Sequence, residues 1–187
     1  MEINILIHGS SAGFNSQFMQ FINTGLNKAG KETFGFDFDY IVNDTAPSKG
    51  FIEEYEKIER VISDHVNKGY TKINLIGKSL GGVFCLNEEI ASYADKIVIL
   101  GFPYSLGYPV ELCKKLGKNA SKVSIIQGTN DSLCDLDKLK KLNKIVGGVI
   151  NIIIINNASH GFKPINADTT VEQNYNKVVS AILGVLG

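Results

Sequence analysis

The fold of this chain is decided by one stretch, Asn74-Leu75-Ile76-Gly77-Lys78-Ser79-Leu80-Gly81-Gly82. An apolar run over residues 73–76 leads into it, and a helical pattern follows from Leu80. A buried strand joined to a helix by G-x-S-x-G is the pattern of a nucleophile elbow, a sharp turn that lifts a serine hydroxyl clear of the sheet. The stretch therefore predicts Ser79 as a nucleophile.

The spacing of the glycines in this stretch has a steric reason. The turn holds the serine backbone in a strained conformation. The residues two before and two after it crowd each other, so both should lack side chains, as Gly77 and Gly81 do. A helix N-terminus favours negative charge, and the Leu80 amide is expected to face a developing oxyanion. Because two glycines around a serine also occur in ordinary turns, the interpretation needs partners elsewhere in the chain.

Composition predicts a single globular domain over residues 1–187. A hydrophobic content of 44% suits a folded chain that buries a sizeable core. Acidic and basic residues balance at 19 each, so no electrostatic footprint indicates nucleic acid or an anionic membrane. The longest apolar run, 152–155, is too short to span a membrane, and residues 3–7 are predicted to form a strand rather than a leader. We expect a cytoplasmic protein with a small-molecule partner and leave the oligomeric state open.

The three cysteines favour packing over chemistry. An odd number cannot all pair, and Cys85, Cys113 and Cys134 lack the spacing of metal ligands. Neither Cys85 nor Cys134 has a base at a plausible distance along the chain. We expect reduced, mostly buried thiols, no metal site and no cofactor.

Apolar runs alternate with helical patterns along the whole chain. Continuous Ile/Val runs predict strands that are buried on both faces, which is typical of a parallel sheet covered by helices on both sides. The fold class is therefore α/β, a doubly wound, mostly parallel six-stranded sheet without a cap domain. Strands are expected at 3–7, 34–42, 73–76, 96–100, 123–127 and 149–155. Helices are expected at 14–29, 51–67, 80–93, 110–116, 136–146 and 171–186.

Polar side chains follow several of the predicted strands. In a parallel sheet, function collects on the loops at the carboxyl ends of the strands, where Ser79, Asp131 and His160 would meet. A serine hydroxyl needs a base to take its proton. His160 is predicted to be that base, and Asp131 is predicted to orient the imidazole.

Each of these residues also has a structural interpretation. Asp131 follows a glycine and is compatible with a turn or a helix cap, while Asp135 and Asp137 favour a helix start. His8 precedes a tight glycine turn, and we expect its ring to brace that loop. His65 lies on a predicted helix and is not a catalytic candidate.

Four motifs together resemble a known family. They are His8-Gly9, Gly77-Lys78-Ser79-Leu80-Gly81-Gly82, Gln127-Gly128-Thr129-Asn130-Asp131 and Ser159-His160-Gly161-Phe162. Their order of nucleophile, acid and base is that of the α/β-hydrolase superfamily, and the chain resembles its small, cap-less dienelactone-hydrolase-like members. The resemblance spans nearly the whole chain and implies the amide of Ser10, in preference to that of Ser11, as a second oxyanion donor.

The chain departs from that family in two ways. The N-terminal hairpin strands of larger members are missing, so the first strand would carry the oxyanion loop. Dienelactone hydrolases use cysteine as the nucleophile, whereas this chain has Ser79, which argues against their substrates.

Aromatic residues gather in the loops on the same edge as the elbow. They are predicted either to line a substrate pocket or to cover the end of the sheet: Phe102, Tyr104, Tyr108 and Phe162. No insertion is long enough to form a lid domain, so the cleft should be open.

The leading interpretation is a serine hydrolase that cleaves a small carboxylic ester or thioester through an acyl-enzyme intermediate. One alternative is a small-molecule or protein binding module on a hydrolase scaffold, because a fold does not guarantee activity. The other is a peptidase or amidase that uses the same three residues.

Overall fold

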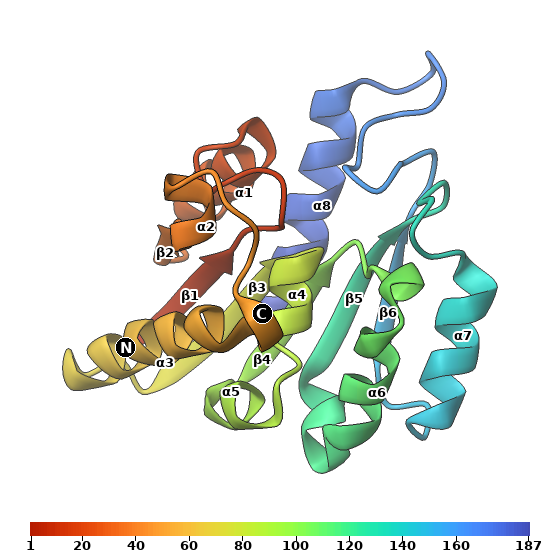
Figure 1. The fold of residues 1–187 in the computed structure, drawn as a ribbon. Helices are drawn as coiled ribbons and strands as arrows, with labels where there is room; N and C mark the ends of the chain where they lie inside the picture. Colours follow the sequence, from red (N-terminus) through yellow and green to blue (C-terminus); the bar gives the residue numbers. More distant parts are fainter.

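The computed structural model describes residues 1–187, with the side chains of Tyr108 and Pro109 left outside the description. A six-stranded, all-parallel sheet runs through it (Figure 1), as the Ile/Val runs predicted. Its strands are β1 Glu2–Ile7, β2 Thr33–Phe36, β3 Lys72–Lys78, β4 Lys96–Leu100, β5 Val123–Gly128 and β6 Asn151–Ile155. The helices are α1 Gln17–Lys28, α2 Asp39–Val42, α3 Ile52–Asn67, α4 Leu80–Phe84, α5 Glu88–Tyr93, α6 Tyr108–Lys115, α7 Leu136–Ile145 and α8 Val171–Leu186.

The strand order β2-β1-β3-β4-β5-β6 creates a switch point between β1 and β3. From β1 the chain first moves outward to β2, then returns to β3 and continues in the other direction. Loops that leave neighbouring strands in opposite directions open a crevice at the carboxyl edge of a parallel sheet. The elbow serine follows β3, so this topology places it at that crevice.

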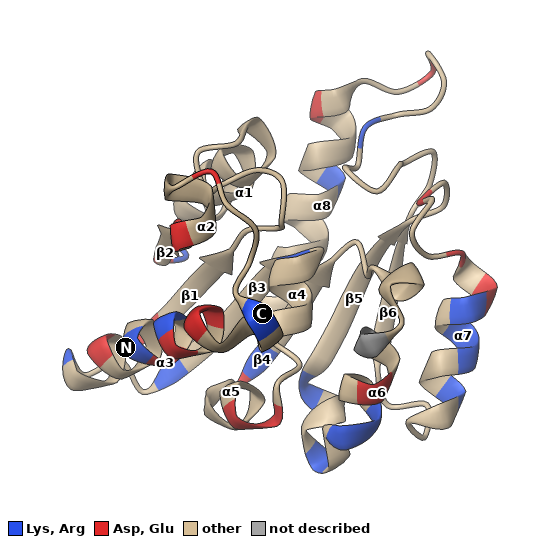
Figure 2. Cartoon of the chain, viewed as in Figure 1, with Lys and Arg blue, Asp and Glu red and all other residues tan. Residues whose placement is uncertain are grey.

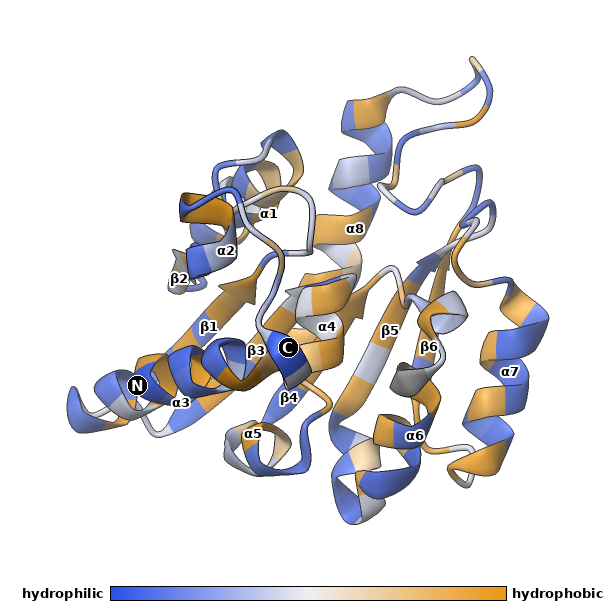
Figure 3. Ribbon diagram, viewed as in Figure 1, coloured by the Kyte–Doolittle hydropathy of each residue, from blue (hydrophilic) through white to orange (hydrophobic). Residues whose placement is uncertain are grey.

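Helices cover both faces of the sheet, and each face has its own apolar core. Helices α1 and α8 pack on one face through residues such as Met19, Ile22 and Val178. Helices α3, α4, α5, α6 and α7 contribute to the core on the other face, where Ile58, Phe84 and others are fully buried. The strands are hydrophobic in Figure 3, and Figure 2 shows the charges on the outer helices, notably α3 and α7.

The second predicted strand is wrong in its second half. Alternating aromatics over 34–42 predicted one long strand, but only Thr33–Phe36 pairs with β1, and the pairing ends at Ile7 with Phe36. Beyond Ile7 the neighbouring chain leaves the sheet, so no ladder remains for residues 38–42. The Phe38 N–H instead donates to His8 Nε2 at 3.0 Å, and α2 begins at Asp39.

The helix predicted from the elbow to residue 93 is also interrupted. It ends at Phe84, and α5 begins only at Glu88. Asn87 has extended backbone angles, and its side-chain oxygen accepts from the N–H groups of Glu89 and Ile90. Asparagine is among the strongest N-cap residues, so this local capping outweighs continuation of the helix.

Candidate active site

Ser79 lies in the turn between β3 and α4 with φ 51° and ψ −113°, a conformation that side chains rarely adopt. A methyl group on Gly77 would overlap the backbone of Gly81 and Gly82, as the elbow pattern requires. Gly81 must lack a side chain for another reason than the predicted one. A methyl group there would overlap the carbonyl groups of Ile7 and His8, at the end of β1. The turn is therefore packed directly onto the strand that carries the adjacent loop.

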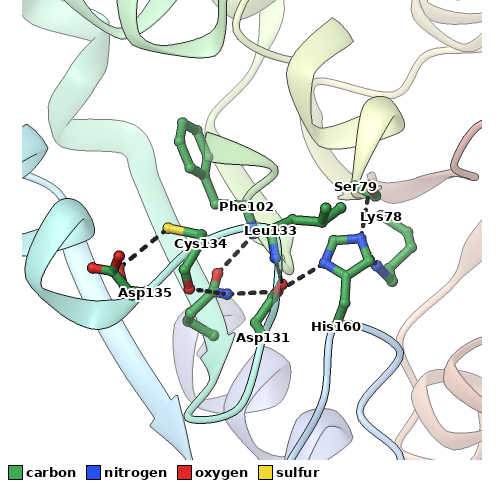
Figure 4. Close-up of polar contacts among 9 residues, drawn as sticks. Lys78, Ser79, Phe102, Asp131, Leu133, Cys134, Asp135 and His160 are labelled. Atoms are coloured by element: carbon green, nitrogen blue, oxygen red, sulfur yellow. Dashed lines mark hydrogen bonds and ion pairs between the residues drawn. The ribbon is translucent and has the colours of Figure 1, made fainter. Parts of the chain in front are cut away.

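The three predicted side chains meet although they are far apart in sequence (Figure 4). His160 Nε2 lies 2.9 Å from Ser79 Oγ, and His160 Nδ1 lies 2.7 Å from Asp131 Oδ2. The carboxylate accepts from Nδ1–H, which leaves the lone pair of Nε2 facing the serine hydroxyl. In this tautomer the imidazole is oriented to accept a proton from Ser79.

Asp131 is buried and fully occupied by donors. Its Oδ2 also accepts from Gln127 Nε2 at 2.6 Å, and its Oδ1 accepts from the Leu133 N–H at 2.8 Å. Gln127 is itself fully buried, and its Oε1 accepts from the Phe102 N–H at 2.8 Å. This amide therefore ties the end of β4 to the acid, a role that the motif around Gln127 does not indicate.

A close approach of two loops brings the acid to the histidine. A methyl group on Gly128 would overlap the Ala158 carbonyl, so the chain after β5 can lie against the chain after β6 only with glycine there. The Asn130 N–H donates to the same carbonyl at 2.9 Å. The separation of 29 residues between Asp131 and His160 is closed by this contact.

The two predicted oxyanion donors belong to different loops near the serine. Leu80 is the first residue of α4, so its N–H has no acceptor within the helix. Ser10, in the loop after β1, lines the same cavity as Ser79. Leu80 thus follows the nucleophile directly and Ser10 shares its cavity, and the role of both amides in binding an oxyanion stays a prediction.

His8 braces the loop that carries Ser10. The ring is fully buried, its Nδ1 donates to the Gly9 carbonyl at 2.7 Å, and its Nε2 accepts from the Phe38 N–H. Both ring nitrogens are thus engaged with the backbone in the neutral form, and burial lowers the pKa of His8. The structural interpretation of this histidine is confirmed.

A cavity of about 480 Å³ opens beside Ser79 at the switch point. It lies between the loop after β1, the start of α1 and the loop after β6. Its walls combine apolar and polar residues, including Phe18, Met19, Leu133, Tyr175, Ser10 and Lys163. The cavity therefore has room for a small substrate next to the hydroxyl.

Among the aromatic wall candidates whose side chains are described, none lines the cavity. Phe102 and Phe162 are fully buried in the two cores, and Phe162 stacks on Phe18 at 5.4 Å between ring centroids. Tyr104 packs against the core of the opposite face. The side chain of Tyr108 lies outside the described residues. The aromatic rings that line the cavity come from α1 and α8 instead, and a role of Phe102, Tyr104 and Phe162 in covering the end of the sheet stays a prediction.

Lys78, which occupies the first x position of G-x-S-x-G, also contacts the site. Its Nζ lies 3.1 Å from His160 Nε2, the nitrogen that faces Ser79 (Figure 4). The side chain is partly buried, and desolvation lowers the pKa of Lys78 to about 8, against a smaller opposing effect of Asp131. Apart from the position of Lys78 next to the nucleophile, no sequence pattern indicates this contact.

The remaining predictions about chemistry concern thiols, metals and membranes. Cys85, Cys113 and Cys134 are free and buried, and burial raises the pKa of each thiol, so they are inert packing groups as expected. Among the described residues, no cluster of His, Cys, Asp and Glu is arranged to hold a metal ion. In the same part of the chain, no helix is long and apolar enough to cross a membrane.

Comparison with known proteins places the chain in a family. Residues 2–186 match the model of an alpha/beta hydrolase domain. The chain belongs to the alpha/beta hydrolase family. No curated protein matches the sequence.

Solved structures of other alpha/beta hydrolases share the whole fold. A serine hydrolase without a lid from Xanthomonas campestris has a TM-score of 0.77 at 13% identity, over 98% of this chain and 80% of its own. A serine hydrolase homologue from Coxiella burnetii has a TM-score of 0.75 at 15% identity, over 100% of this chain and 85% of its own. An esterase from Pyrococcus furiosus has a TM-score of 0.67 at 15% identity, over 99% of this chain and 80% of its own. At these identities the likeness establishes the fold.

Proposed function

We propose that this alpha/beta hydrolase cleaves a carboxylic ester or thioester of a small molecule through an acyl-enzyme intermediate. The observation that carries the proposal is the line of contacts from Ser79 Oγ through the His160 ring to Asp131, at 2.9 Å and 2.7 Å. A nucleophile within reach of a base, with the base held by a third group, is the arrangement of nucleophilic acyl transfer. The esterase among the proteins of similar fold is consistent with this reaction class.

In the acylation step, Ser79 Oγ forms a bond to the substrate carbonyl carbon while its proton moves to His160 Nε2. Negative charge develops on the carbonyl oxygen, where the N–H groups of Leu80 and Ser10 would stabilise it. Asp131 stabilises the imidazolium through its contact with Nδ1–H. The tetrahedral intermediate then expels the alcohol or thiol, which takes the proton from Nε2.

Deacylation repeats the sequence with water as the nucleophile. His160 removes a proton from the water as its oxygen bonds to the acyl carbon. Collapse of the second intermediate releases the carboxylic acid and returns the proton to Ser79 Oγ. The net reaction consumes one water and gives one acid with one alcohol or thiol.

A panel of 4-nitrophenyl esters and acyl thioesters of increasing chain length tests the proposal, run on wild type and Ser79→Ala. We expect Ser79-dependent turnover of at least one ester or thioester, and covalent labelling of Ser79 by a fluorophosphonate probe. Amide substrates in the same panel would reveal a peptidase or amidase. Absence of both labelling and turnover would instead support a binding module on a hydrolase scaffold.

A further inference from the structure

The cavity beside Ser79 is positively charged. Two lysines line it, Lys78 from the elbow and Lys163 from the loop after β6, and no carboxylate is found among its described lining residues. The acid of the site, Asp131, lies behind His160 and does not reach the cavity wall. In the part of the chain that the structure describes, neither lysine forms an ion pair with a carboxylate. Charges that are partly removed from water are ordinarily paired, so the partly buried Lys78 ammonium is available to an anion in the cavity.

Lys78 and Ser79 compete for the same lone pair. With Nδ1–H donated to Asp131, His160 offers a single acceptor at Nε2. The Ser79 hydroxyl approaches it at 2.9 Å and the Lys78 ammonium at 3.1 Å. While the ammonium is in that position, it weakens the hydrogen bond that activates the serine.

The same contact also opposes the transition state. Attack by Ser79 moves a proton to Nε2, which creates an imidazolium about 3.1 Å from the ammonium. Like charges at that distance in a partly buried site repel strongly. The ammonium therefore has to lose its charge or turn toward an anion for the base to work well.

We propose that Lys78 makes this hydrolase selective for esters that carry a second, negatively charged group, and that this anion draws the ammonium away from His160. The inference rests on the proposed ester or thioester hydrolysis. A carboxylate or phosphate in the cavity would pair with the Lys78 ammonium, and Lys163 adds attraction from the loop after β6. Binding of the right substrate then frees Nε2 for Ser79.

The surroundings of Lys78 allow this movement. A four-carbon stem carries the ammonium, which lies 6.0 Å from the centre of the Phe162 ring. Gly101, with φ 71°, adds no side chain beside Lys78 Nζ and the His160 ring, where a methyl group would come within 3.2 Å of both. The charged or titratable groups around the ammonium are Asp131 and His160, and the same cavity is also lined by Lys163 and Tyr175. Because burial lowers the pKa of Lys78 to about 8, neutral amine also becomes available in mildly alkaline solution.

The test uses two 4-nitrophenyl esters of matched length, the neutral pentanoate and the anionic glutarate monoester. For wild type at pH 7 we expect kcat/KM for the anionic ester to exceed that for the neutral ester by at least tenfold. Lys78→Met should reverse this preference, with several-fold faster hydrolysis of the neutral ester. Lys78→Gln, which keeps a donor without the charge, should lose the preference as well. Lys141→Met, a substitution on the exposed side of α7, should keep the wild-type ratio.

The pH profile gives a second readout that a merely structural lysine would not change. With the neutral ester, wild-type kcat/KM should rise as pH passes about 8, where the ammonium loses its proton. That rise should be absent in Lys78→Met, and it should be small for the anionic ester, whose carboxylate already pairs with the ammonium. An equal preference for both esters in wild type, or an unchanged ratio in Lys78→Met, would overturn the proposal. Ser79-independent turnover would instead overturn the proposed hydrolysis itself.

Discussion

The two sides of the His160 ring are built in opposite ways. On the Nδ1 side, Asp131 is buried and each of its oxygens has a donor within 2.6–2.8 Å. On the Nε2 side, Ser79 and Lys78 both approach one lone pair at the edge of an open cavity. One side has a fixed set of partners, and the other has more donors than acceptors.

This difference separates orientation from selection. A buried polar network whose members are all satisfied holds one geometry, because any rearrangement leaves a buried group without a partner. A site with competing donors has no such single arrangement, so a ligand can change which donor is bound. The acid side should therefore respond to mutation through the rate of the chemical step, and the cavity side through substrate preference and pH.

The largest effect is expected at the atom that both sides serve. Ser79→Ala deletes the attacking oxygen, and we expect kcat to fall by about four orders of magnitude or more. The hydroxyl lies at a half-buried position and makes one hydrogen bond, to His160, so the free energy of unfolding should change by less than about 1 kcal/mol. Urea unfolding and ester turnover measure the two quantities on one preparation. Wild-type turnover in this variant would exclude Ser79 as the nucleophile.

The acid side is tested next by Asp131→Asn. The amide keeps the size of the carboxylate but favours the wrong tautomer of His160, and we expect kcat to fall by roughly two to three orders of magnitude. Asp135→Asn is the matched control, since Asp135 caps α7 through the Lys138 N–H at 2.8 Å and does not contact the site. It should lower stability by at most about 1 kcal/mol without changing kcat. A large loss of kcat in Asp135→Asn, or wild-type kcat in Asp131→Asn, would show that the acid is misassigned.

Sequence patterns predicted most of this framework because it follows from topology. Parallel strands bring their carboxyl ends to one edge, so Ser79, Asp131 and His160 could be placed together from their positions after strands alone. The bounds of β4 and α8 follow equally directly from long apolar patterns between clear stops. These features depend on periodicity, which is a local property of the chain.

The features that the sequence did not predict depend on contacts between distant segments. Strand β2 ends where β1 leaves the sheet, which the aromatic alternation of residues 34–40 cannot indicate. The partner of Gln127 and the burial of Lys78 arise only when loops from different strands pack together. A lysine inside G-x-S-x-G has the same sequence signature whether it points to solvent or to the base.

Gln127→Leu tests whether the acid side acts as a connected network. The substitution leaves the Phe102 N–H and one bond of Asp131 Oδ2 without their partner, so we expect the protein to lose about 1 to 3 kcal/mol of stability. A shifted carboxylate should reduce kcat roughly tenfold, with little change in the ratio between anionic and neutral esters. Gln173→Ala removes a side chain of the α8 capping box that does not line the cavity, and it serves as a control for lowered stability. Equal kcat in the two variants would mean that Gln127 only stabilises the fold.

The smallest effect concerns the stability of the cavity side. The pKa of Lys78 is about 8 in the folded protein and 10.5 as the reference value of a lysine in the open chain. Between these values the unfolded chain binds more protons than the folded one, so wild-type stability attributable to this group rises with pH. Below pH 8 the full penalty of burying the ammonium is present.

Lys78→Met removes that penalty but also the attraction to the Phe162 ring, and we expect a net gain in stability of about 1 to 2 kcal/mol at pH 7. The gain should shrink toward pH 10, which urea unfolding of both proteins at the two pH values would measure. A Lys78→Met protein that is less stable than wild type at pH 7, by a margin that stays constant to pH 10, would show that the ammonium is already well paired in the folded state, and the contrast between the two sides of His160 would then disappear.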